Sequence, residues 1–216
     1  MRDVPPYRPP HPPYLSVAHM DEEVIAVVKP AGLLSVPGKP PEMDDCVETR
    51  AQRAFGRAFI CHRLDMATSG LILLARSKAA QRSLSMQFEA REISKTYHAL
   101  VQGEVAEDAG EIDLPLRTDW PNRPLQMVCP ESGKPSRTLW EVEERRDGAT
   151  LLRLTPVTGR SHQLRVHLMA IGHPIVGDPF YGEGEAEAPR LMLHASRIEW
   201  RRVDGAGCAA SAPHPF

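Results

Sequence analysis

Residues 61–75 read CHRLDMATSGLILLA, and this stretch decides how the chain around it is interpreted. Its apolar end, Leu71–Ala75, predicts a buried strand, and the Thr-Ser-Gly before it is typical of a turn. Asp65 stands on that turn, where a rigid neighbouring strand could hold a single catalytic carboxylate in place. Asp beside Thr, Ser and Gly is also ordinary turn chemistry. Spacing alone leaves both interpretations open.

The remaining pattern predicts several strands and two helices. Ser77 is a suitable N-cap for a helix through Arg91, and a second helix is expected over 161–170 with Gly172 as its C-cap. Strands outnumber helices, and few are joined by helical crossovers. This favours an α+β fold with a mainly antiparallel mixed sheet flanked by helices and loops. The other strand-like runs are Val24–Val28, Tyr97–Val101, Thr138–Val142, Leu151–Leu154 and Leu191–Ser196.

The two ends of the chain differ from its middle in composition. Residues 1–13 contain six prolines and predict an extended, flexible arm. Residues 204–216 are rich in small residues and predict a flexible tail. The middle, 14–203, has no linker or internal repeat, so we expect one catalytic domain, acting as a monomer.

Composition narrows the class of protein. No apolar run approaches a membrane span, and the N-terminus lacks the apolar core of a signal peptide. The four cysteines are scattered, with no C-x-x-C pair, which predicts reduced thiols in a cytoplasmic protein. The common nucleotide-binding and hydrolase motifs do not occur.

Charge is distributed unevenly. The net charge is −2, which argues against a protein that coats nucleic acid by bulk electrostatics. Residues 50–100, however, hold nine basic and three acidic side chains. A locally basic face would suit a phosphate-bearing substrate, although a solvated helix face has the same composition.

A second polar segment, 155–167, runs from a strand through a glycine turn into a helix N-terminus. Helix N-termini and arginines attract anions, so Arg160 and Arg165 could hold a phosphate or carboxylate. Arg165 either faces Asp65 and keeps it ionised, or is an ordinary surface arginine. His162 and His167 lack the spacing of a helical zinc pair, so no metal site is predicted. Tyr97 could stack on a base or simply pack in the sheet.

Five segments in this order resemble the RluA-type family of pseudouridine synthases over roughly 14–200. They are Lys29–Leu34, the loop His62–Gly70, Lys95-x-Tyr97, Thr158–His167 and Gly172–Asp178. Three further segments are similar to the short bacterial members that modify both 23S rRNA and tRNA anticodon stem-loops and lack an S4 domain. These are Asp119–Pro124, Gly133–Pro135 and Pro189–Ala195.

The resemblance implies isomerisation of uridine to pseudouridine in structured RNA, a 23S rRNA hairpin or a tRNA anticodon stem-loop or both, without a cofactor. By that resemblance Asp65 is the catalytic carboxylate, as nucleophile or as base. Arg165 pairs with it, Tyr97 stacks on the target uracil, and Arg63 enters the RNA stack where the nucleotide flips out. His62, Thr68, Arg160 and His162 complete the predicted RNA-contacting set.

Two other functions compete with this interpretation. An RNA-binding or assembly factor could use the same scaffold without turnover, but all the expected active-site side chains are present. A sugar hydrolase normally uses two carboxylates, and only one lies in a motif here. The acidic residues Glu183, Glu185 and Glu187 depart from the short bacterial members and could narrow the substrate range by repelling phosphates.

Overall fold

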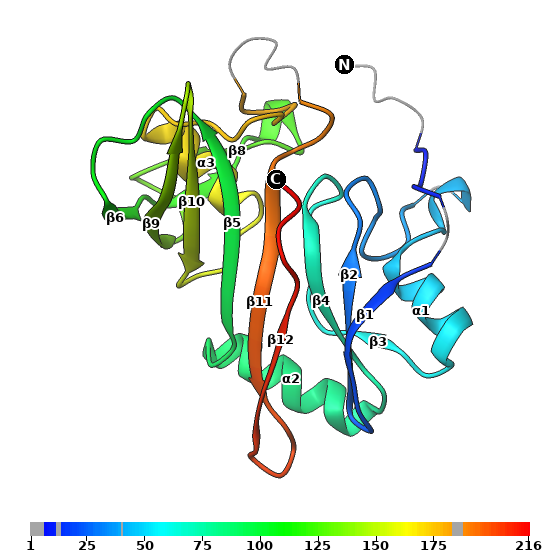
Figure 1. Cartoon of the computed structure of the whole chain (residues 1–216). Coiled ribbons are helices and arrows are strands. Elements are labelled where there is room, and N and C mark those ends of the chain that lie inside the picture. The colour runs from blue at the N-terminus through cyan, green and yellow to red at the C-terminus, as the bar shows by residue number, and fades with distance from the viewer. Residues whose placement is uncertain (1–6, 12–13, 40, 183–187) are drawn as a thin grey trace. The chain divides into compact units, whose positions relative to one another are not determined.

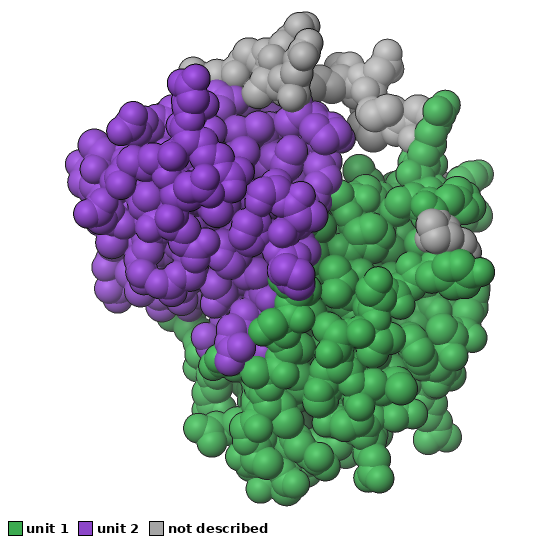
Figure 2. All heavy atoms as spheres, in the orientation of Figure 1, with its two compact units in different colours: residues 1–93, 199–212 green, residues 94–198, 213–216 purple. Residues whose placement is uncertain are grey.

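The computed structural model describes residues 7–11, 14–39, 41–182 and 188–216. They form two compact units (Figure 2), where the sequence predicts one domain over 14–203. Figure 1 labels the helices and strands. Unit 1 comprises residues 1–93 and 199–212, and unit 2 comprises 94–198 and 213–216. None of the helices in the described part of the chain is long and apolar enough to cross a bilayer. The acidic residues at 183–187 lie outside the described residues.

Unit 1 is built on antiparallel strands joined in the order β1-β2-β4, with β3 also paired to β4. Every residue of β4 is buried, which explains the unbroken apolar run Leu71–Ala75 in it. Ile72 and Leu74 pack with Val47 and Ala51 of α1, so this helix covers one face of the sheet. The elements are β1 (Ser16–Met20), β2 (Val24–Lys29), η1 (Pro41–Met43), α1 (Val47–Phe55), β3 (Phe59–Ile60), β4 (Ser69–Ala75), α2 (Lys78–Ala90) and β12 (Gly207–Ser211).

Unit 2 is built on antiparallel strands in the order β5-β10-β9-β6, with a separate hairpin of β7 and β8. Val166 and Met169 of α3 pack on this hairpin. The elements are β5 (Ser94–Gln102), β6 (Ala109–Asp113), β7 (Leu116–Thr118), η2 (Trp120–Asn122), β8 (Gln126–Val128), β9 (Arg137–Arg146), β10 (Ala149–Pro156) and α3 (Gln163–Ala170). The remaining strand, β11 (Leu193–Arg201), begins in unit 2 and ends in unit 1.

These elements confirm the predicted α+β class. Five of the six strand-like runs lie within strands, and the sixth, Leu191–Ser196, overlaps β11 from Leu193 onward. Ser77 caps α2 by accepting a hydrogen bond from the Ala80 amide at 3.1 Å. The second predicted helix begins two residues later than expected, because His162 has a left-handed φ of 53°. Ile171, not Gly172, is its C-cap, and Gly172 follows with a φ of 84°.

Both ends of the chain are more ordered than their composition predicts. Tyr7 donates a hydrogen bond to the Asp45 carbonyl at 2.6 Å, and Arg50 donates to the Pro10 carbonyl at 3.0 Å. Part of the proline-rich arm is therefore fixed to unit 1. In the tail, β12 forms a strand over Gly207–Ser211, where small side chains give little strand signal. Residues 1–6 and 12–13 of the predicted arm lie outside the described residues.

Candidate active site

The turn that carries Asp65 is fixed by backbone contacts within unit 1. The Asp65 carbonyl accepts a hydrogen bond from the Thr68 amide at 3.1 Å, which closes the turn. Ser35 holds the preceding residue by donating to the Leu64 carbonyl at 2.8 Å and accepting from the Leu64 amide at 3.1 Å. The Met66 carbonyl accepts from the Gly32 amide at 2.8 Å. The Asp65 carboxylate is half-buried on a turn with little freedom to move.

A buried lysine lies under this turn. Lys29 is fully buried at the end of β2, and its Nζ donates to the carbonyls of Pro30, Leu33 and Met66 at 3.0, 2.7 and 2.9 Å. Three acceptors match the three N–H groups of an ammonium. Burial lowers the pKa of Lys29 to about 7, and the negative charge of Asp65 partly opposes that shift. The resemblance includes Lys29 but assigns it no role. The structure shows that its ammonium group is bound to the backbone of the Asp65 turn.

We expect Lys29 to leave a signature in the pH dependence of stability. The folded state holds this proton less tightly than the unfolded chain, so its contribution to the free energy of unfolding is constant below pH 7. It then rises as pH increases from about 7 toward 10.5. The slope of this contribution against pH is at most about 1.4 kcal/mol per pH unit. Urea unfolding of the wild type and Lys29→Met at pH 7, 8 and 9 should show a steeper rise for the wild type. The same pH dependence of the unfolding free energy in both proteins would contradict a lowered pKa for Lys29.

The neighbours of Asp65 divide into exposed and structural side chains. Arg63 is exposed, whereas Thr68 is buried. The His62 Nε2 accepts a hydrogen bond from the Leu73 amide of β4 at 2.9 Å, and its ring lies 4.6 Å from that of Phe88. His62 therefore connects the Asp65 loop to β4 and to α2 within unit 1.

Unit 2 holds Arg165 in a buried ion pair that sequence reasoning missed. Arg165 is 2% exposed, and its Nε and Nη2 each donate to a carboxylate oxygen of Asp178 at 2.7 Å. Asp178 also accepts from the amides of Phe180 and Tyr181 at 2.9 and 3.1 Å. The guanidinium lies 5.1 Å from each of these two rings. The alternative that Arg165 is an ordinary surface arginine is therefore wrong.

Polar side chains hold the rest of α3. His162 lies 2.7 Å from the Tyr181 hydroxyl, which accepts from the Gln126 amide at 2.9 Å. The His167 Nε2 donates to the Leu114 carbonyl at 3.0 Å, so its Nδ1 accepts from the Thr138 hydroxyl at 2.9 Å. Burial lowers the pKa of His167, consistent with this neutral form. His167 thus has a structural role in unit 2.

The structure brings two of the predicted segments of unit 2 together. A Cβ built on Gly159 would lie 3.5 Å from the Lys95 Nζ, so the Lys95-x-Tyr97 strand runs beside the glycine turn that leads to α3. Lys95 and Tyr97 share one face of β5 because strand residues alternate. Both are partly buried, and burial lowers the pKa of Lys95. Arg160, just after the turn, donates to the Pro135 carbonyl at 3.3 Å.

The basic stretch predicted over 50–95 is only partly a surface. Arg50 is 4% exposed and forms a bidentate pair with Asp45, at 2.7 and 2.8 Å, so it is a structural residue. The exposed basic side chains that remain are Arg53, Arg57, Arg63, Lys78, Arg82 and Arg91.

Comparison with solved structures identifies the class. Human RNA Pseudouridylate Synthase Domain Containing 1 superimposes with a TM-score of 0.84 at 31% identity, covering 97% of this chain and 87% of that one. The α+β architecture is therefore that of pseudouridine synthases.

Sequence comparison identifies the family. Residues 23–170 match the family described as RNA pseudouridylate synthase. The protein named dual-specificity RNA pseudouridine synthase RluA from Pasteurella multocida (strain Pm70) is 50% identical over 214 residues, which cover 97% of this chain and 98% of that protein. Its namesake from Escherichia coli (strain K12) is 52% identical over 195 residues, 89% of each. The chain belongs to the RNA pseudouridylate synthase family, and its activity is the isomerisation of uridine to pseudouridine in RNA.

Proposed function

We propose that Asp65 starts this isomerisation, as the nucleophile or as the base, and that Arg165 is its charged partner. Tyr97 stacks on the target uracil. In the reaction the N1–C1′ bond of uridine breaks, the uracil turns, and C5 bonds to C1′. The product has the formula of the substrate, so one carboxylate suffices and no water need be activated. The observation that carries this proposal is the geometry of the Asp65 turn. Ser35, Gly32 and Lys29 hold its backbone in place by hydrogen bonds.

Arg63, two residues before Asp65, is the proposed base-flipping residue. Its side chain is exposed beside a rigid turn, so it is available to fill the gap left by an extruded nucleotide. Extrusion costs a few kcal/mol and costs less in a loop than in a duplex, which favours hairpin-loop substrates. Thr68 and His62 support the turn, while Arg160 and His162 are proposed to contact the RNA near the start of α3.

The proposed substrates are stem-loops of 23S rRNA and of tRNA anticodon arms. Support comes from the name dual-specificity carried by relatives that are 50 to 52% identical over most of this chain. The proposed location is the cytoplasm, where both RNAs occur, and the proposed state is a monomer. The test is incubation of the protein with each stem-loop, followed by nucleoside analysis. Pseudouridine in both supports the proposal. Modification of neither would refute the substrate assignment, and free uracil with abasic RNA would indicate a hydrolase instead.

An exposed tryptophan in unit 2 is suited to stack on an unpaired base of that RNA. Trp120 is 65% exposed, and the Arg123 guanidinium lies 4.6 Å from its ring. Asn122 braces the turn by donating to the Asp119 carboxylate at 2.9 Å. In β8, the next strand, the Gln126 amide donates a hydrogen bond to the Tyr181 hydroxyl. The Tyr181 ring lies 5.1 Å from the Arg165 guanidinium. The turn that carries Trp120 is therefore linked to Arg165 through β8 and Tyr181.

We expect Trp120→Ala to weaken stem-loop binding by about tenfold, since base–aromatic stacking contributes about 1–3 kcal/mol per base. The kcat should change little, because the ring does not act on the reacting atoms, and Trp120→Phe should retain most of the affinity. Tyr14→Ala is the matched control, because Tyr14 is 79% exposed. Affinities measured by fluorescence anisotropy that do not change in Trp120→Ala would argue against stacking.

A further inference from the structure

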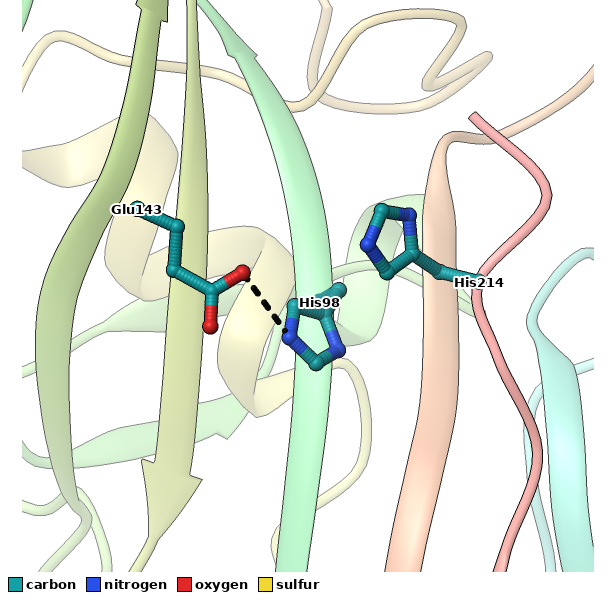
Figure 3. Close-up of side chains that lie close together, drawn as sticks. All are labelled: His98, Glu143 and His214. Atoms are coloured by element: carbon teal, nitrogen blue, oxygen red, sulfur yellow. Dashed lines mark ion pairs between the residues drawn. The ribbon is translucent and has the colours of Figure 1, made fainter.

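A cluster of two histidines and a carboxylate lies in unit 2 on the opposite face of β5 from Tyr97. His98 is next to Tyr97 in sequence, so its side chain points to the other side of the strand. One potential ligand atom from each of His98, Glu143 and His214 lies within 4.8 Å of the other two. Figure 3 shows His98 and Glu143 joined by an ion pair and the His214 ring turned toward them from the C-terminal segment. The proposed catalytic roles use none of these residues.

Hydrogen bonding fixes which nitrogen of His98 faces Glu143. The His98 Nδ1 lies 2.8 Å from the Ser196 hydroxyl, and that hydroxyl donates to the Thr96 carbonyl at 3.2 Å. The His98 Nε2 therefore faces the Glu143 Oε2, 3.0 Å away. In the tautomer that carries its proton on Nδ1, His98 donates to Ser196 and presents the Nε2 lone pair on the side of Glu143, as a metal-binding histidine does.

Arg153 and Ser196 orient the two side chains of this pair. Arg153 lies 3.6 Å from the other Glu143 oxygen, so Oε2 stays directed at His98. The hydrogen bond from Nδ1 to Ser196 is also the kind of contact that orients a metal-binding histidine.

We propose that His98, Glu143 and His214 bind a divalent transition metal ion of the Zn²⁺ type, with water in the fourth position. The ion would fasten residues 213–216 to β5 and β9. These residues already lie against unit 2, since the His214 and His98 rings are 4.5 Å apart and the Arg190 guanidinium lies 5.5 Å from the Phe216 ring. The two rings are stacked with an angle of 28° between them, so metal binding requires the His214 side chain to turn a nitrogen toward the His98–Glu143 pair.

The test uses full-length protein without a histidine tag, stripped with a chelator and titrated with Zn²⁺ by calorimetry. We expect one saturable ion per chain. Both His214→Ala and Glu143→Gln should weaken binding by more than about tenfold, since even loss of a residue that only orients a ligand costs that much. His11→Ala, at an exposed histidine in unit 1, should bind as the wild type does.

Co²⁺ provides a second readout at the same site. We expect visible absorption bands typical of a tetrahedral nitrogen and oxygen site in the wild type and in His11→Ala. These bands should be lost in His214→Ala, a tail substitution that leaves the cores of both units intact. Absence of saturable Zn²⁺ binding would overturn the proposal and leave an ordinary His98–Glu143 ion pair. Binding that persists unchanged in both variants would overturn it equally.

Discussion

Asp65→Asn is expected to abolish pseudouridine formation while leaving RNA affinity within a few-fold of the wild type. The substitution preserves the size of the side chain and removes the charge needed to attack C1′ or take a proton. We expect the single-turnover rate on a stem-loop to fall by about 10⁴-fold or more, the upper end of what a positioned acid–base group contributes. The Asp65 backbone contacts that fix the turn do not involve the carboxylate, so the fold should survive.

The matched control is Asp113→Asn, at an exposed aspartate of β6. It removes the same charge from the chain and should retain the wild-type rate. A rate for Asp65→Asn close to that of the control would show that the carboxylate does not take part in the chemistry.

Among the substitutions proposed for this protein, Asp178→Asn is expected to lower the free energy of unfolding the most. It removes the negative charge that accepts hydrogen bonds from the Nε and Nη2 of the 2% exposed Arg165 guanidinium. Removing one partner of a buried, hydrogen-bonded ion pair typically costs about 3–5 kcal/mol, because the other charge stays buried without the carboxylate that offset its desolvation. The measurement is the free energy of unfolding in urea.

Asp44→Asn is the control for that experiment, because Asp44 pairs with Arg53 at 3.4 Å and both side chains are more than half exposed. An exposed pair contributes within about 1 kcal/mol. Equal unfolding free energies for the two variants would mean that Asp178 does not stabilise Arg165.

Long apolar runs made most of the fold predictable. β4 is buried along its whole length, and five of its seven residues form the apolar run Leu71–Ala75. α2 was equally clear from its Ser77 cap and its stripe of buried Ala80 and Leu84. α1 was missed because its sequence, VETRAQRAF, has few apolar residues, and its capping box uses Cys46 with Thr49, an unusual pair.

The candidate site was predictable in its residues but not in their support. The position of Arg165 depends on Asp178, thirteen residues away, and on the rings that follow it. Lys29 is buried because loop carbonyls from Pro30, Leu33 and Met66 converge on its ammonium. Periodicity reports which face of an element is apolar, and it does not report which distant partner makes a buried charge tolerable. The pairing of Asp65 with Arg165 stays a prediction.

The central claim is that the Asp65 carboxylate is required for this protein to form pseudouridine in cellular RNA. The most direct test is a pseudouridine map of total RNA. It would be made from cells lacking the gene and complemented with the wild type, Asp65→Asn or Asp113→Asn. We predict that deletion removes pseudouridine from a 23S hairpin-loop uridine and from an anticodon-arm uridine. The wild type and Asp113→Asn restore both sites, and Asp65→Asn restores neither. Restoration of these sites by Asp65→Asn would contradict the account.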